Sequence, residues 1–278
     1  MTKINLVEHD YALHLHDWQQ NMETGLRAED GWLTVVGLDW LDEGDNFVGS
    51  APTTDVTLPN AAVPSEVGVL HLEHGRVALH ITTDMPVLVN GLPVKDVVLH
   101  DDSADEPPTK VQIGSVTFFI IKRGDQYAVR IRDTQSHARQ TFSGRAWFPA
   151  DESYRVVGHL IPHASEQPLE VESANGPNTI LSNPGRVEFE LHGEHLSLEA
   201  AKDGDQLWFI FRDGTSGIST YGASRFLKAP FTSDGTVDLD FNKAYHPPCG
   251  FTAYATCPLP PRQNRLTIAI EAGEKLPV

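Results

Sequence analysis

The sequence predicts an all-β protein of two parts, in which a β-sandwich preceded by helices packs on a second β-rich domain. Short runs of alternating apolar and polar residues recur from Trp32 onward, such as residues 77–81, 127–132 and 266–270. This period of two is typical of strands with one buried face. Turn signals such as Asn90-Gly91 separate the runs at intervals typical of sandwiches and barrels. No regular alternation of strands and helices is visible, so the pattern does not favour a parallel α/β sheet.

The N-terminal segment is predicted to be helical. Residues 7–29 contain large apolar residues at roughly helical spacing among charged and polar neighbours: Val7, Tyr11, Leu13, Trp18, Met22 and Leu26. Such spacing places the apolar side chains on one face of a helix. We therefore expect one or two helices within residues 1–31.

Two β-rich blocks follow, and we place the boundary between them near residue 150. The predicted domains are a sandwich over residues 32–150 and a second β domain over residues 151–278. The stretch between them contains Phe142, Trp147 and Phe148. Large apolar side chains are poorly suited to a solvated linker, so we expect the two blocks to pack closely.

The composition is that of an acidic globular protein. The 278 residues include 21 Lys and Arg against 38 Asp and Glu, a formal net charge of -17. The resulting field repels nucleic acid and anionic membrane surfaces, so neither is an expected partner. A small-molecule ligand is the expected partner, and nothing in the sequence predicts an oligomeric state.

The sequence also predicts a cytoplasmic location. Its first residues do not form a basic segment followed by an apolar one, and no stretch approaches 18 apolar residues. The chain contains two cysteines, too few for a disulfide framework. A cytoplasmic location would keep both as thiols.

Distinctive motifs lie along most of the chain, at residues 31–41, 211–217, 220–222, 225–227, 240–242, 247–249, 255–260 and 271–274. Together they resemble the DUF1684 family, a domain of unknown function. The resemblance spans about residues 31–274 and implies no particular activity. The family usually has Asn-Pro-Pro-Cys where this chain has His246-Pro247-Pro248-Cys249. A mechanism shared by the family would therefore not require His246.

The first β block also resembles, weakly, a forkhead-associated domain. The resemblance rests on Gly49-Ser50, on Ser65 and on a hairpin at Asn90-Gly91. It implies a forkhead-associated-like sandwich. Those domains bind phosphothreonine through an Arg after the first Gly and a His after the Ser. Here Ser50 and Gly68 occupy these places, so the charged donor for phosphate is missing.

The segment 240–266 is the predicted functional site. It contains both cysteines and five prolines, Pro247, Pro248, Pro258, Pro260 and Pro261. Proline fixes φ and removes a backbone donor, so this segment is expected to be rigid and irregular. Rigid loops often carry binding and catalytic residues.

The two cysteines, Cys249 and Cys257, allow three interpretations. They could bind zinc together with ligands such as His246, Asp240 or Glu274. They could be buried structural residues that hold the proline-rich loops, or they could lie near enough to each other to oxidise. Alternatively, Cys249 could be a nucleophile with His246 as its base.

Carboxylates of the same region offer a further chemistry. Asp240 and Glu274 could act as general acid and base, as in hydrolytic enzymes. Arg225 could then bind a substrate anion, because its guanidinium makes paired contacts with carboxylates. Equally, Arg225 could pair with Asp240, and the carboxylates could hold loops together.

Other polar residues complete the predicted site. Asp213 is expected to make an Asx-type turn, after which Tyr221 faces the same pocket as Arg225. The remaining candidates for orienting a ligand are Asn242, Tyr245 and Asn264.

The best functional hypothesis from the sequence is therefore a small-molecule enzyme, with hydrolysis as one option. The alternative is a non-catalytic ligand-binding or protein-interaction module that uses Tyr245, Arg225 and the prolines.

Overall fold

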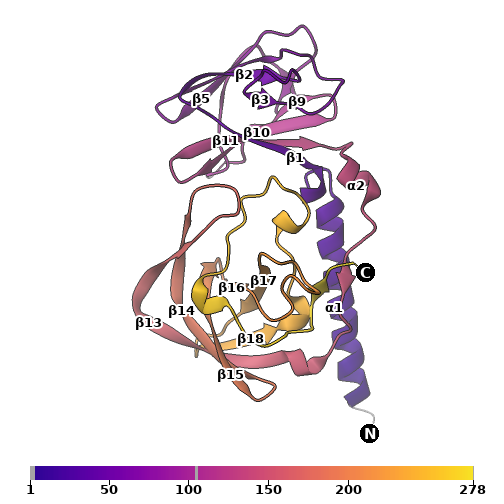
Figure 1. Cartoon of the computed structure of the whole chain (residues 1–278), viewed down its shortest axis with the longest axis vertical. Helices are drawn as coiled ribbons and strands as arrows, with labels where there is room; N and C mark the ends of the chain where they lie inside the picture. The colour runs from indigo at the N-terminus through magenta and orange to yellow at the C-terminus, as the bar shows by residue number, and fades with distance from the viewer. Residues whose placement is uncertain (1–3, 104–105, 278) are drawn as a thin grey trace. The chain divides into compact units, whose positions relative to one another are not determined.

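The computed structural model describes residues 4–103 and 106–277. The chain forms two compact units (Figure 1). Unit 1 comprises Met1–Gly25, Ser143–Gly250 and Thr256–Val278, and unit 2 comprises Leu26–Phe142 and Phe251–Ala255. The predicted domain bounds of 1–31, 32–150 and 151–278 stay predictions. The structure confirms the all-β class with a helical N-terminal segment.

The N-terminal segment forms helix α1, Ile4–Arg27. Its apolar side chains include Leu15, which is buried, and Trp18. Within unit 1 the Trp18 ring packs edge-on against Trp147, with 5.5 Å between the ring centroids. Among the described residues, no helix combines the length and the apolar character needed to cross a bilayer.

Unit 2 is a sandwich of two sheets around one hydrophobic core. The first sheet has the strand order β1 (Val35–Trp40), β11 (Gln126–Asp133), β10 (Val116–Arg123), β9 (Val111–Ile113), β6 (Leu88–Val89) and β7 (Leu92–Pro93). The second has the order β3 (Val56–Thr57), β2 (Gly44–Gly49), β4 (Gly68–Glu73), β5 (Arg76–Ile81) and β8 (Asp96–Leu99). Short helical turns η1 (Trp32–Thr34) and α2 (His137–Thr141) flank the sandwich in sequence.

Buried and exposed side chains alternate along the strands of unit 2, and the buried ones form its core. In β4 the burial alternates along the strand, so that Leu70 and Leu72 are buried while His71 and Glu73 are exposed. This is the pattern of a sheet with one solvated face. The predicted strands at residues 77–81 and 127–132 lie within β5 and β11 and are confirmed.

Unit 1 is built on a sheet that nearly closes into a barrel. Its strand order is β17 (Arg225–Pro230), β16 (Gln206–Phe211), β15 (Glu194–Asp203), β14 (Thr179–Leu191), β13 (Arg155–Val171) and β18 (Thr236–Asp240). A bridge between Phe231 and Val237 joins the β17 end to β18. The long, curved strands β13 and β14 are visible in Figure 1.

The barrel core consists largely of aromatic and branched side chains. Phe209, Phe211 and Phe241 are fully buried. Phe241 packs against Phe211 with 5.9 Å between the ring centroids. A short second sheet pairs β12 (Ala146–Trp147) with β19 (Glu274–Lys275). Single helical turns η2 (Glu152–Tyr154), η3 (Phe241–Lys243), η4 (Pro248–Gly250) and η5 (Arg262–Asn264) complete the unit.

The prediction of a strand at residues 266–270 is wrong. This run is irregular, although Ile270 is fully buried. It pairs only locally with the segment after β16, where Leu266 N donates to Arg212 O and Ile268 O accepts from Gly214 N. Ile270 O accepts from the Arg225 side chain. The Ile270 carbonyl is thus satisfied by a side chain.

Gly273 permits a close backbone approach next to β19. Its φ is +79°, and a Cβ atom at this position would lie 2.3 Å from Ala244 O. The neighbouring residue Glu274 donates its N–H to the same Ala244 carbonyl at 2.8 Å. The absence of a side chain at Gly273 therefore sets the position of Glu274.

We expect Gly273→Ala to destabilise the protein more than a glycine substitution of similar φ in open space. Gly204, with φ +62° and no atom within 4 Å of the place that a Cβ would take, is the matched control. Gly204→Ala should cost about 1–2 kcal/mol for the left-handed backbone. Gly273→Ala should cost about 1–3 kcal/mol more because of the clash with Ala244. Urea unfolding of both variants measures this, and equal losses would contradict the close approach.

Candidate functional site

Arg225, the first residue of β17, is the central buried cation of unit 1. Its side chain is fully buried, and Nη1 donates to Asp213 Oδ2 at 2.6 Å and to Ile270 O at 2.9 Å. Nη2 donates to Ala272 O. The guanidinium also lies over the Phe211 ring, 5.4 Å from its centroid. Burial lowers the pKa of Arg225, and the neighbouring Asp213 carboxylate opposes this shift.

These contacts correct one alternative from the sequence. The ion-pair partner of Arg225 is Asp213, not Asp240. Both side chains of the pair have no solvent exposure. The role of Arg225 as a ligand anchor stays a prediction, and every contact described for its guanidinium is internal to unit 1.

Asp213 also organises the loop that follows β16. Its Oδ1 accepts from Thr215 N at 2.7 Å and from Thr215 Oγ1 at 2.5 Å. This is the expected Asx-type turn. Thr215 O in turn accepts the N–H groups of Ile218, Ser219 and Thr220. The loop leading to Tyr221 is therefore held by its own hydrogen bonds.

Glu274 forms a second buried ion pair, with Arg145. Arg145 Nη1 donates to Glu274 Oε2 at 2.5 Å, and the two side chains are 5% and 2% exposed. The same oxygen accepts from His246 N at 2.7 Å. Burial raises the pKa of Glu274 to about 7, while Arg145 favours the charged carboxylate. Glu274 thus connects β19 to the start of the proline-rich segment.

His246 is buried and neutral. Burial lowers its pKa to about 3, and the Arg225 and Arg145 guanidinium groups contribute to this shift. Its Nε2 accepts a hydrogen bond from Tyr221 N at 3.1 Å. Because that lone pair is in use, His246 positions Tyr221 and is not free to remove a proton from Cys249.

Cys249 and Cys257 lie side by side without forming a disulfide. Cys249 is partly exposed and Cys257 is buried. Cys249 N donates to Cys257 Sγ at 3.2 Å. A hydrogen bond from the Cys257 thiol, together with one from the Tyr221 hydroxyl, lowers the pKa of Cys249 to about 7. Burial raises the pKa of Tyr221, so its hydroxyl stays protonated.

No metal site is apparent at this pair. In residues 4–103 and 106–277, no group of three or more His, Cys, Asp or Glu side chains is placed to hold a metal ion. The zinc hypothesis for Cys249 and Cys257 stays a prediction.

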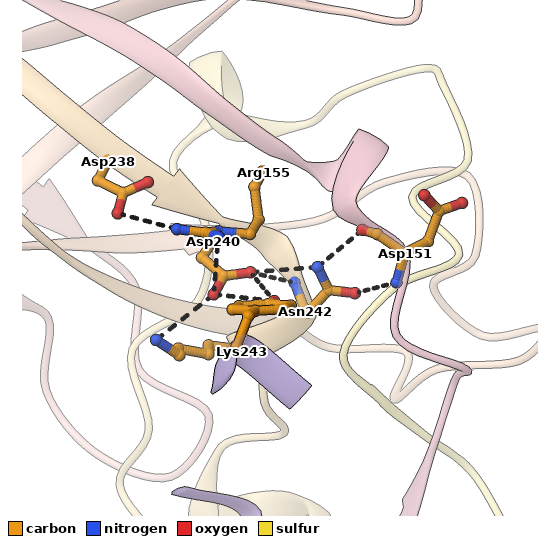
Figure 2. A network of polar contacts seen from close by, with 7 residues as sticks. Asp151, Arg155, Asp238, Asp240, Asn242 and Lys243 are labelled. Atoms are coloured by element: carbon orange, nitrogen blue, oxygen red, sulfur yellow. Dashed lines mark hydrogen bonds and ion pairs between the residues drawn. The ribbon is translucent and has the colours of Figure 1, made fainter. Parts of the chain in front are cut away.

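Asp240 lies in a separate network at the end of β18, shown in Figure 2. The Tyr11 hydroxyl, from helix α1, lies 3.0 and 3.1 Å from the two carboxylate oxygens. Two cations are near Oδ2: Lys243 Nζ at 3.4 Å and Arg155 Nε at 3.9 Å. Arg155 also stacks over the Tyr11 ring at 4.3 Å. The network therefore attaches α1 to the barrel.

Asn242 extends the same network to the start of the barrel. Its Nδ2 lies 3.2 Å from Asp240 Oδ1 and 2.9 Å from Asp151 O. Its Oδ1 accepts from Asp151 N at 3.0 Å. The amide thus bridges the segment before β13 to the end of β18, as Figure 2 shows.

The contacts of the last two predicted site residues, Asn264 and Tyr245, are with the barrel strands and their aromatic side chains. Asn264 is fully buried, accepts from Glu199 N at 2.7 Å, and donates to Glu199 O and Ile210 O. It therefore joins β15 and β16. The Tyr245 ring packs edge-on against Phe226 at 5.8 Å. Burial raises the pKa of Tyr245 to about 12.

The predicted site residues thus divide into distinct groups. Tyr221 lies with the two cysteines, whereas Asp240 and Asn242 lie with Tyr11, and Asn264 lies between strands. Asp240 and Glu274 share no described partner. Sequence reasoning missed Arg145 and Tyr11. Arg145 is the one charged residue in the run 142–148. A single cation among large apolar residues could have indicated a buried ion pair.

Part of the chain matches a protein family for which no activity is described. Residues 140–275 match the family model described as a protein of unknown function, DUF1684. None of the curated proteins compared with the chain matches it.

Solved structures give partial similarities. An uncharacterised protein from gene locus rrnAC0354 of Haloarcula marismortui, solved by NMR, is 32% identical, with a TM-score of 0.43. The match covers 50% of this chain and 79% of that protein. The FhaA FHA domain, solved in complex with the intracellular domain of Rv3910, is 17% identical with a TM-score of 0.24. That match covers 34% of this chain and 97% of the FHA domain.

We expect Tyr11→Phe to destabilise the protein by about 1.5–3 kcal/mol, the usual contribution of a hydrogen bond to a charged group. The substitution leaves the buried Asp240 carboxylate without its closest side-chain donor. Tyr254→Phe, at a ring that is 41% exposed, is the control and should change little. Chemical unfolding measures both. A loss in Tyr11→Phe no greater than in the control would contradict the assigned contact.

We also expect Arg225→Lys to be strongly destabilising, by about 3–5 kcal/mol, as for a broken buried ion pair. A lysine keeps the charge but lacks the planar fork that reaches Asp213 and two carbonyls at once. Arg186→Lys is the matched control, because Arg186 pairs with Glu188 on the surface at 46% exposure. Thermal and urea unfolding should show almost no change in this control. Similar effects of the two substitutions would contradict the anchoring role of Arg225.

Proposed function

The chain belongs to the DUF1684 family through residues 140–275, and we propose that it is a small-molecule enzyme whose reactive group is the Cys249 thiolate. The supporting observation is that Cys249 is partly exposed and that its N–H donates to Cys257 Sγ at 3.2 Å, while Cys257 and Tyr221 lower the pKa of its thiol to about 7. We call Tyr221, His246, Cys249 and Cys257 the thiol cluster.

The donors around Cys249 favour its ionised form. A thiolate is a far better nucleophile than a thiol, and free cysteine ionises near pH 8.5. With a pKa of about 7, a large fraction of Cys249 is ionised at neutral pH. Tyr221 keeps its proton under these conditions and remains a donor to the sulfur.

The other members of the cluster position these donors. His246 Nε2 accepts from the Tyr221 N–H and so fixes the backbone of Tyr221. Glu274 accepts from the His246 N–H and fixes the backbone of His246. Because the thiolate forms without a neighbouring base, the neutral His246 is compatible with this chemistry.

In the proposed reaction the Cys249 sulfur attacks an electrophilic atom of a small molecule. The sulfur lone pair forms the new bond, and the leaving group departs with the electron pair of the broken bond. The protein's net charge of -17 favours neutral or cationic substrates over anionic ones. A cytoplasmic location, itself still a prediction, would keep the thiol reduced.

The hydrolytic mechanism based on Asp240 and Glu274 has weaker support. Glu274 is engaged by Arg145 and His246, and Asp240 by Tyr11 and Asn242. An acid–base pair must act on one substrate from a shared pocket. The two carboxylates have separate partners, so we assign them positioning roles.

We expect Cys249 to react with iodoacetamide with a midpoint near pH 7, whereas an ordinary thiol has its midpoint near pH 8.5. Peptide-resolved mass spectrometry of the native protein follows the rate against pH. Tyr221→Phe should move the midpoint to higher pH, because the thiolate loses a donor. Tyr254→Phe is the matched control and should leave it unchanged.

A midpoint at or above pH 8.5 in the native protein would contradict the proposal. That result, together with a small molecule that raises the melting temperature without being converted, would favour the non-catalytic binding module instead.

A further inference from the structure

The arrangement of Cys249 and Cys257 suggests which electrophile the thiol cluster accepts. The two residues are eight positions apart in sequence, yet the Cys249 N–H donates to Cys257 Sγ at 3.2 Å. Cys257 is also the largest cause of the lowered pKa of Cys249. A disulfide requires Cβ atoms about 3.5–4.5 Å apart. The fold therefore places Cys257 Sγ against the backbone of Cys249, so that rotation of the Cys249 side chain can turn its sulfur toward Cys257 Sγ.

The backbone on both sides of the pair is held in place. Cys257 O accepts from Ala174 N at 2.9 Å, and the nearby Leu259 N donates to Glu172 O at 2.7 Å. On the other side, Gly250 N donates to Pro247 O at 2.9 Å, which closes the turn containing Cys249. The proximity of the two thiols is thus built into the fold.

The two thiols differ in solvent exposure. Cys249 is partly exposed, whereas Cys257 is 4% exposed. A reagent from solution therefore meets Cys249 first. Cys257 lies behind it, in reach of the Cys249 sulfur. This order is the one that thiol–disulfide exchange needs, with an outer attacking thiol and an inner resolving thiol.

We propose that the thiol cluster exchanges with small-molecule disulfides, with Cys249 as the attacking thiol and Cys257 as the resolving thiol. This inference rests on the proposed function, because it needs a nucleophilic Cys249, and it adds the substrate class.

The exchange proceeds in two balanced steps. The Cys249 thiolate attacks one sulfur of the disulfide RSSR, the S–S bond breaks, and one RS⁻ leaves with the electron pair. Cys257 then gives its proton to a departing thiolate, and its sulfur attacks Cys249 Sγ. The second RS⁻ leaves, and the Cys249–Cys257 disulfide forms. The two protein thiols are oxidised, and RSSR is reduced to two RSH, of which one takes its proton from Cys257 and the other from water.

Tyr221 contributes to both steps through its hydroxyl. It donates to the Cys249 sulfur before the reaction. When Cys257 attacks the mixed disulfide, negative charge develops on the leaving sulfur, which is bonded to Cys249. A protonated hydroxyl beside this bond stabilises that charge. Tyr221 is therefore expected to affect exchange as well as alkylation.

The test uses the full-length reduced protein and bis(2-hydroxyethyl) disulfide, an uncharged probe. Intact-mass spectrometry after acid quenching should show the wild-type protein losing the mass of two hydrogen atoms, with peptide mapping joining Cys249 to Cys257. Cys257→Ser should stop at a mixed disulfide on Cys249. Cys249→Ser should react at least about tenfold more slowly, since the remaining thiol is buried. Unfolding curves of both variants confirm that they remain folded.

The outcomes separate this inference from the proposed function. A wild-type protein that stops at the mixed disulfide, while Cys249 still alkylates with a midpoint near pH 7, would overturn the exchange proposal alone. Reaction of Cys249→Ser as fast as the wild type would overturn the assigned order of the thiols. A Cys249 that neither alkylates near neutral pH nor exchanges would overturn both proposals.

Discussion

The buried pair of Arg225 and Asp213 is the interaction on which the rest of unit 1 depends. One guanidinium joins the β16–β17 loop, through Asp213, to the carbonyls of Ile270 and Ala272. Two residues after Ala272, Glu274 accepts from the backbone of His246. His246 in turn accepts from the backbone of Tyr221. A chain of polar contacts thus connects the barrel to the thiol cluster.

These contacts explain how an irregular C-terminal segment is held without regular strand pairing. Proline removes backbone donors, so the segment offers few ladder hydrogen bonds. Side chains supply the missing partners: Arg225 takes two carbonyls, and Asn264 takes backbone groups of Glu199 and Ile210. A buried charge is costly when it loses its partner, so each ion pair also restricts the alternative arrangements of the loop.

Residues predicted as one site serve three different purposes in the structure. Asp240 and Asn242 attach α1 and the start of β13, Arg225 and Glu274 hold the C-terminal segment, and Tyr221 donates to a thiol. Sequence proximity grouped these residues into one segment. It did not assign partners, because the partners Tyr11, Arg145 and Asp213 come from distant parts of the chain.

The sequence by itself determined the all-β class, the N-terminal helix and many of the strands, because periodicity and turn residues act over a few positions. It also located the irregular, proline-rich segment that contains both cysteines. The tertiary structure showed that residues 266–270 form no strand and that Arg225 binds the Ile270 carbonyl. It likewise decided which carboxylate pairs with Arg225 and that Cys257 Sγ lies against the backbone of Cys249. These outcomes depend on contacts between residues far apart in sequence, which no local pattern encodes.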